Sequence, residues 1–145
     1  MITKKRIIIF AVIIAVATMA VVGITLAVVF TSERTTVNSG TFSNFHSSAR
    51  DDHWLVVARS ANGRARIDRT LTAEELSNLR VEGAADGGIA LRVEQRDSAG
   101  AFAMTVDLTG QVSGDIDLQA FDPGRIRLVL EFNHATDVNV TVRWD

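Results

Sequence analysis

The chain has 145 residues, of which 47% are hydrophobic and 22% are charged, and its formal net charge at pH 7 is −2. It contains no cysteine, which excludes disulfides, thiolate catalysis and zinc sites built on thiolates. All 17 Asp and Glu residues lie after residue 30, together with 12 Arg and no Lys, so this part carries a net charge of −5. We therefore expect no general attraction for nucleic acids and no nucleic-acid partner.

Residues 7–30 form an apolar run that contains no charged residue and no proline. As a helix this run would be roughly 36 Å long, enough to cross a hydrocarbon core of about 30 Å with some tilt. A soluble helix of this length would show a polar face. The run predicts a transmembrane helix that acts as a signal anchor. Residues 1–6 are then a cytoplasmic basic flank, because Lys4, Lys5 and Arg6 precede the span and no excess of cations follows it.

The alternative for this segment is a signal peptide that is cleaved after Ala17 or Ala20. Hydrophobicity continues to Phe30 without a break, which favours an uncleaved anchor. Small residues also recur at a spacing of four within the run, a pattern that lets two helices approach closely. These residues predict self-association of the helix in a homo-oligomer: Ala11, Ala15, Gly23 and Ala27.

Residues 31–48 are rich in Ser and Thr and predict a short stalk between the span and the folded domain. Phe42 and Phe45 interrupt this polar composition. We therefore expect the second half of the segment to dock on the domain as a first strand or strap.

Residues 49–145 show the period-two alternation of antiparallel strands that have one wet face. In the stretch 125–132, "RIRLVLEF", the apolar phase alternates with Arg125, Arg127, Val129 and Glu131, and in 138–144, "VNVTVRW", it alternates with Asn139, Thr141 and Arg143. Asn62-Gly63 predicts a tight hairpin, and glycines mark further turns. The fold class is therefore all-β: an antiparallel β-sandwich, Ig-like or jelly-roll-like, of seven or eight strands.

One segment departs from the strand pattern. Thr72 and Glu75 have the spacing of a capping box, which predicts a short helix over one open end of the domain, with an irregular loop as the alternative. Trp54 and Trp144 fall on the apolar phase of their strands. A core position is the expectation for both, and stacking against sugars is the alternative.

The sequence gives little support for a catalytic site or a metal site. His46 and His53 flank two aspartates, but without the spacing that would fix a metal-ligating geometry. No nucleophile elbow and no phosphate-binding glycine loop is present. We predict no enzyme activity, no metal and no cofactor. A weaker alternative, for Ca²⁺, is a set of outward-facing aspartates without a supporting loop motif: Asp107, Asp115 and Asp117.

The predicted hairpin 53–69 carries the most informative surface. If Asn62-Gly63 makes a two-residue turn, Arg59 lies opposite Arg66, and like charges in that position destabilise a sheet. Two alternatives remain for this repulsion: Asp68 neutralises the arginines within the domain, or an acidic partner does so. Arginines beside exposed aliphatic residues are typical of protein interfaces. The predicted partner-binding face consists of Leu55, Val57, Arg59, Arg64, Arg66 and Asp68.

Taken together, these patterns predict a single-pass protein of the cell membrane, with its N-terminus in the cytoplasm and residues 31–145 outside. The architecture resembles that of small membrane-anchored surface domains of bacteria. The expected function is that of a non-catalytic binding or accessory subunit that docks on a membrane or cell-envelope protein. The alternatives are a ligand- or carbohydrate-binding module and a structural protomer of a surface assembly.

Overall fold

A computed structural model describes residues 36–97 and 100–145. These residues belong to one unit of the chain, Glu33–Asp145. Within the described ranges no helix has the length and hydropathy needed to cross a membrane. The predicted span 7–30 and its small-residue stripe (Ala11, Ala15, Gly23 and Ala27) lie outside the described residues.

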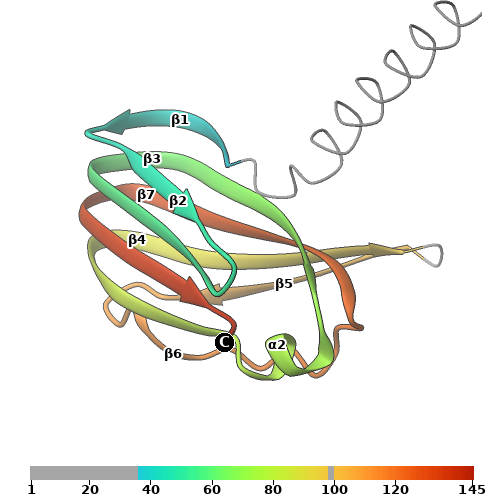
Figure 1. Cartoon of the computed structure of the whole chain (residues 1–145). Coiled ribbons are helices and arrows are strands. Elements are labelled where there is room, and N and C mark those ends of the chain that lie inside the picture. Colours follow the sequence, from blue (N-terminus) through green and yellow to red (C-terminus); the bar gives the residue numbers. More distant parts are fainter. Residues whose placement is uncertain (1–35, 98–99) are drawn as a thin grey trace, which may run out of the picture. The chain divides into compact units, whose positions relative to one another are not determined.

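The domain is built on one seven-stranded antiparallel sheet that is not closed (Figure 1). The order of the main path is β1-β3-β7-β4-β5, with β2 pairing with β3 and β6 pairing with β4. The strands are β1 (Val37–Ser43), β2 (His46–Ala49), β3 (His53–Leu71), β4 (Arg80–Asp97), β5 (Gly100–Asp107), β6 (Ser113–Asp115) and β7 (Gly124–Arg143). The antiparallel all-β class is thus confirmed.

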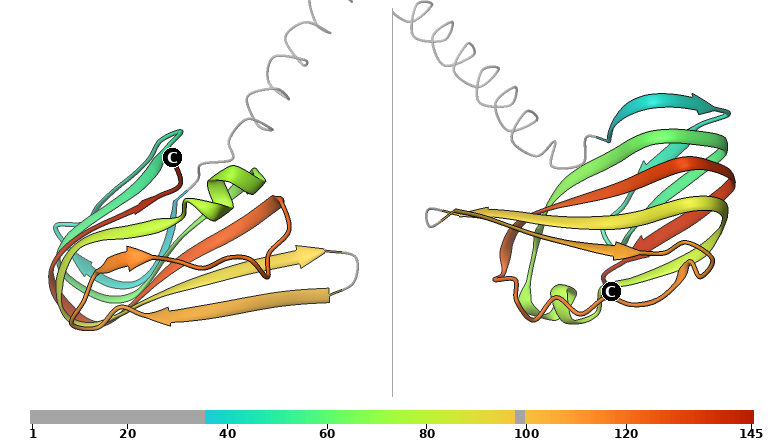
Figure 2. Two further views of the ribbon diagram at one scale, coloured as in Figure 1. Left: turned by 90° about the horizontal axis from the view of Figure 1, so that it is seen from below. Right: turned by 180° about the vertical axis from the view of Figure 1, so that it is seen from behind.

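Three long strands run through the whole sheet and divide it into two halves. We call one the Trp half: residues 53–60 of β3, 136–143 of β7 and 80–86 of β4, flanked by β2 and β6. The other is the Arg half: residues 63–71 of β3, 124–132 of β7 and 88–97 of β4, flanked by β1 and β5. Figure 2 shows the sheet bent back on itself between them.

The pairing register shifts at the bend. In β3 the shift against β7 lies between Ala61 and Gly63, and in β4 the shifts against β7 lie between Ala84 and Gly88. Gly63 has φ +151° and Gly83 has φ +140°. An added Cβ would collide with the carbonyl oxygen of the facing strand at both positions, Ser39 at the first and Asn139 at the second. Only glycine lets the backbones approach this closely while the strands change direction.

The predicted hairpin turn at Asn62-Gly63 is therefore wrong, because β3 continues through it as one strand of 19 residues. Gly63 allows β3 to bend while its backbone stays extended, because the strand pairs with β1 on one side and with β7 on the other. A tight turn would have needed residues 64–71 to fold back onto residues 53–61.

The alternation predicted for the inner face is confirmed. Trp54 and Trp144 have no exposed surface, and residues of both halves form one buried cluster. The indole N–H of Trp54 donates to Ser47 Oγ at 2.9 Å, and that of Trp144 donates to the carbonyl oxygen of Asp51 at 2.6 Å. Both tryptophans are therefore core residues with satisfied polar atoms. No polar or charged side chain is buried in the described part of the chain.

The predicted short helix is present as α2 (Ala73–Ser77) on the side of the domain away from the bend (Figure 2). Its capping box is complete: Thr72 accepts from the backbone N–H of Glu75, and the Glu75 carboxylate accepts from the N–H of Thr72. Leu76 and Leu79 are buried, so the helix region covers the core as expected.

The second half of the predicted stalk docks on the sheet, as expected, because it supplies both β1 and β2. Phe45 lies 4.8 Å from Phe42 between ring centroids, and Phe42 makes an edge contact with Phe132 at 6.1 Å. Phe42 and Phe45 are partly buried and pack against the core, to which Phe132 belongs.

Candidate binding surface

The bend separates the residues that were predicted to form one partner-binding face. Leu55 and Val57 lie half-buried on the Trp half, next to β2. Arg64, Arg66 and Asp68 lie on the Arg half, next to β1 and β7. The expected repulsion between Arg59 and Arg66 does not arise, because the strand never folds back and Arg66 faces Val37 and Val129 instead.

The outer face of the Arg half brings together arginines from three strands. The register places Arg66 of β3, Val129 of β7 and Arg92 of β4 side by side. The neighbouring row holds Asp68, Arg127 and Glu94. Across the three strands the face carries six arginines and three carboxylates: Arg64, Arg66, Arg92, Arg96, Arg125 and Arg127, with Asp68, Glu94 and Glu131. It is a cationic surface on an otherwise acidic domain.

Asp68 is the central anion of this face. Arg127 donates to it through Nε at 2.7 Å and through Nη2 at 3.2 Å, and Arg125 lies 3.5 Å away. The hydrogen bond from Arg127 is the main cause that lowers the pKa of Asp68, and it also raises the pKa of Arg127. The paired geometry, with two parallel N–H donors, is the strong form of an ion pair between Arg and a carboxylate. Asp68 therefore pairs directly with arginines of β7. Arg66 also lowers the pKa of Asp68 through its charge, but it forms no ion pair with it among the described side chains.

The other two carboxylates are engaged as well. Glu94 lies 2.7 Å from Arg92 and 3.9 Å from Arg127, and Glu131 lies 3.2 Å from Arg64. Among the described side chains, Arg66 and Arg96 form no ion pair. They supply the excess of positive charge on the face.

A depression of about 350 Å³ lies in this surface, and we call it the arginine groove. Its lining residues are Val37, Ser39, Arg64, Arg66, Arg92, Glu94, Arg127, Val129 and Glu131. Val129 points outward, away from the core cluster, yet only 6% of it is exposed. A second depression, of about 600 Å³, continues over β4 and β5 and shares Arg92, Glu94 and Arg127 with the groove. The groove therefore has an apolar residue at its base and guanidinium groups around it.

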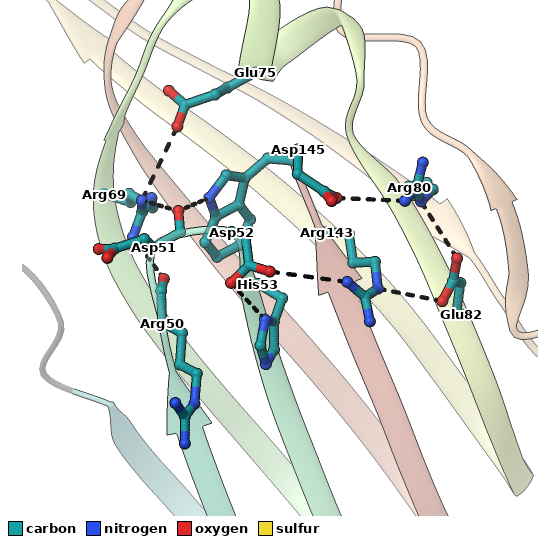
Figure 3. Close-up of polar contacts among 11 residues, drawn as sticks. Arg50, Asp51, Asp52, His53, Arg69, Glu75, Arg80, Glu82, Arg143 and Asp145 are labelled. Atoms are coloured by element: carbon teal, nitrogen blue, oxygen red, sulfur yellow. Dashed lines mark hydrogen bonds and ion pairs between the residues drawn. The ribbon is translucent and has the colours of Figure 1, made fainter.

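A different polar network holds the two halves together (Figure 3). The guanidinium of Arg69 lies 4.5 Å from the ring centroid of Trp144, in a cation–π contact. Arg69 reaches it from the Arg half and also donates to the carbonyl oxygens of Arg50 and Asp51. Only 12% of its side chain is exposed, and Glu75 of α2 lies 4.0 Å away. This network fixes the end of β7 and the segment between β2 and β3.

Asp52 and His53 lie beside that network as a hydrogen-bonded pair (Figure 3). His53 Nδ1 lies 2.7 Å from Asp52 Oδ1, and this hydrogen bond is the main cause that lowers the pKa of Asp52. Arg143 lies 3.3 Å from Glu82 and 3.9 Å from Asp52. In the described ranges no three His, Asp or Glu side chains gather in a way that could hold a metal ion.

The three aspartates considered for Ca²⁺ do not come together. Asp107 ends β5 on the Arg half, whereas Asp115 lies in β6 on the Trp half. Asp107 accepts from the backbone N–H of Thr109, which lowers its pKa, and Asp117 accepts from the N–H of Gln119. Both carboxylates thus cap turns.

Sequence reasoning missed the contribution of β4 and β7 to this surface. Arg92 and Glu94 alternate with the buried Leu91 and Val93, so the outward phase was visible in the stretch "LRVE". What the sequence lacked was the strand order, which sets Arg92 beside Val129 and places Arg66 on the other side of it.

Comparisons with protein-family models, curated proteins and solved structures find no match to this chain. The assignment of function therefore rests on the geometry of the surface described above.

Proposed function

We propose that the protein is a non-catalytic binding or accessory subunit whose arginine groove docks an acidic segment of a protein partner at the membrane. In this proposal the two halves of the bent sheet act as the layers of a β-sandwich. Residues 7–30 anchor it, with the N-terminus in the cytoplasm and the domain outside.

The observation that carries the proposal is the row Arg66, Val129, Arg92. An outward valine that is 94% covered but lies outside the core is unusual, because outward positions of a sheet face water. Because its own chain covers Val129, the surface that a partner meets here is formed by the guanidinium groups around it, and arginine is enriched in binding hot spots. Arg66 interacts with Asp68 only through its charge and has no ion pair among the described side chains, so its N–H donors are available to a carboxylate of a partner.

The charge distribution supports the same partner chemistry. The part of the chain after residue 30 has a net charge of −5, yet this face carries six arginines against four carboxylates when Asp107 of β5 is included. Guanidinium groups bind carboxylates with two parallel hydrogen bonds, which favours an acidic peptide segment. Membrane attachment rests on the charge-free apolar run and its preceding cations.

The test is affinity capture of the full chain from native membranes in mild detergent, followed by mass spectrometry. Arg66→Glu reverses a charge in the groove, whereas Arg59→Glu reverses an exposed arginine of the same strand that lies outside it. We expect Arg66→Glu to reduce the captured partner by about tenfold or more and Arg59→Glu to leave it unchanged. Equal recovery with both variants would refute the groove as the docking site.

A carbohydrate-binding module was the alternative function, and it would need exposed aromatic rings that stack on a sugar. Trp54 and Trp144 are fully buried. Neither ring can stack on a sugar, and we do not propose this function.

A further inference from the structure

Strand β5 forms one edge of the open sheet (Figure 2). Among the described strands it pairs with β4 alone. Its sequence, "GAFAMTVD", has no lysine, no proline and no charge before Asp107. Natural edge strands usually carry lysine, other charged residues or proline, because an unprotected edge is a template for pairing with another strand.

The backbone of β5 has half of its hydrogen-bonding groups directed at this edge. The N–H of Leu108 donates to the carbonyl oxygen of Ile89 at 2.9 Å, in register with the β4–β5 ladder. In an antiparallel pair the bonded positions alternate, so even-numbered residues bond to β4. The N–H and C=O groups of Ala101, Ala103 and Thr105 therefore point away from the sheet.

The side chains of β5 suit an added strand on both faces. On the inner face Phe102 is 48% exposed, and Met104 and Val106 are half-buried. Phe102 makes an edge contact with Phe121, with ring centroids 4.9 Å apart. On the outer face Ala101 and Ala103 are small. An added strand would thus cover apolar side chains without meeting a bulky one.

We propose that β5 pairs antiparallel with β5 of a second copy of this chain, about a two-fold axis at Met104. This register pairs every residue of the segment 101–107. It places Phe102 of each copy opposite Val106 of the other, so that the apolar inner faces of the two sheets become continuous.

Charge complementarity selects a second copy as the occupant. The same register places Asp107 of one copy opposite Ala101 of the other. Extension of the β4–β7 register sets Arg96 beside Arg125, and the β4–β5 register pairs Arg96 with Ala101. Arg96 has no ion pair among the described side chains, and the small Ala101 leaves its path toward Asp107 of the other copy open. The hydrogen bond from Thr109 lowers the pKa of Asp107 and so keeps it charged.

The absence of native cysteine makes a direct test possible. Met104→Cys in the full chain, oxidised in its membrane, should form a disulfide-linked dimer, because residues on the axis face each other at a non-hydrogen-bonded position. Thr41→Cys, on the opposite edge strand β1, is the matched control. We expect most of the first variant and only a background fraction of the second in the dimer band. Equal crosslinking of the two would overturn the proposal.

Two further variants test the register. Phe102→Cys and Val106→Cys should crosslink when they are mixed, and far less when each is present alone. Ala103→Pro removes an N–H that points at the partner and leaves the β4 ladder intact, as prolines on edge strands do. We expect it to abolish the Met104→Cys crosslink with little change in melting temperature. A crosslink that persists in the proline variant would contradict strand pairing.

Discussion

The two halves of the sheet are built from the same three strands, yet their outer faces differ. On the Trp half Leu55 and Val57 lie between the polar residues of β2 and the uncharged Asn139 and Thr141. The charged residues of this face, Arg80, Glu82 and Arg143, lie at its far end and form ion pairs with one another. On the Arg half the corresponding positions carry guanidinium groups and carboxylates in alternating rows. The inner faces are equally apolar. The buried residues of both halves stabilise the fold, whereas in our proposal a partner binds the Arg half alone.

The largest effect on the free energy of unfolding is expected in the core of the Trp half. Trp144→Ala removes a fully buried ring and its contact with Arg69, so we expect it to lower the free energy of unfolding by about 3–5 kcal/mol. Urea unfolding of the full chain, followed by the fluorescence of Trp54, measures it. Val37→Ala, at a residue that is 42% exposed on the Arg half, should cost less than about 1 kcal/mol. Similar costs for the two variants would show that burial of Trp144 does not stabilise the domain.

The next prediction concerns the bend that separates the halves. Gly83→Ala places a Cβ against the carbonyl oxygen of Asn139 at φ +140°, and we expect a loss of about 3 kcal/mol. Gly110→Ala, with φ +81° and no atom within 4 Å of the added Cβ, should lose only about 1 kcal/mol, from backbone strain. Thermal unfolding of both variants gives the comparison. Equal losses would show that close strand approach is not what requires glycine at the bend.

A smaller effect is expected from the ion pairs of the Arg half. The folded state lowers the pKa of Asp68, so its carboxylate stabilises the fold above the unfolded pKa of about 3.9. This contribution is lost as the pH falls below about 4 and through the lower folded pKa. We expect Asp68→Asn to reduce stability at neutral pH and to flatten the loss of stability on acidification. Asp52 and Asp107, whose pKa values are also lowered, should preserve part of the slope in the variant. An unchanged acid slope would rule out Asp68 as a contributor.

The smallest effect is expected at the boundary between the halves. Arg59 is exposed and forms no ion pair among the described side chains. Arg59→Glu should therefore change the free energy of unfolding by less than about 0.5 kcal/mol. A larger change in a urea titration would mean that Arg59 has a structural role.

Local features of the fold could be predicted because they depend on neighbouring residues. The alternation that buries Trp54, Val56, Ala65 and Ile67 follows from the two-residue period of a strand. The capping box around Thr72 is also local, and both of its hydrogen bonds form.

Features that depend on distant segments could not be predicted. Asn62-Gly63 fits a tight turn as well as a bend, and only the presence of β1 and of the 20-residue strand β7 alongside selects the bend. The arginine groove likewise required the strand order. Arg66 and Arg92 were each visible as outward residues, but only their places on either side of Val129 make a surface.

The most direct test of binding by the Arg half compares the outer faces of the two halves in intact membranes. A photo-crosslinking residue is introduced in the full chain at Ser39, which lines the arginine groove, or at Asn139, an exposed outer position of the Trp half. After irradiation of intact membranes, we expect a crosslinked product with one partner protein from position 39 and none from position 139. The same product from both positions, or from position 139 alone, would contradict the assignment of binding to the Arg half.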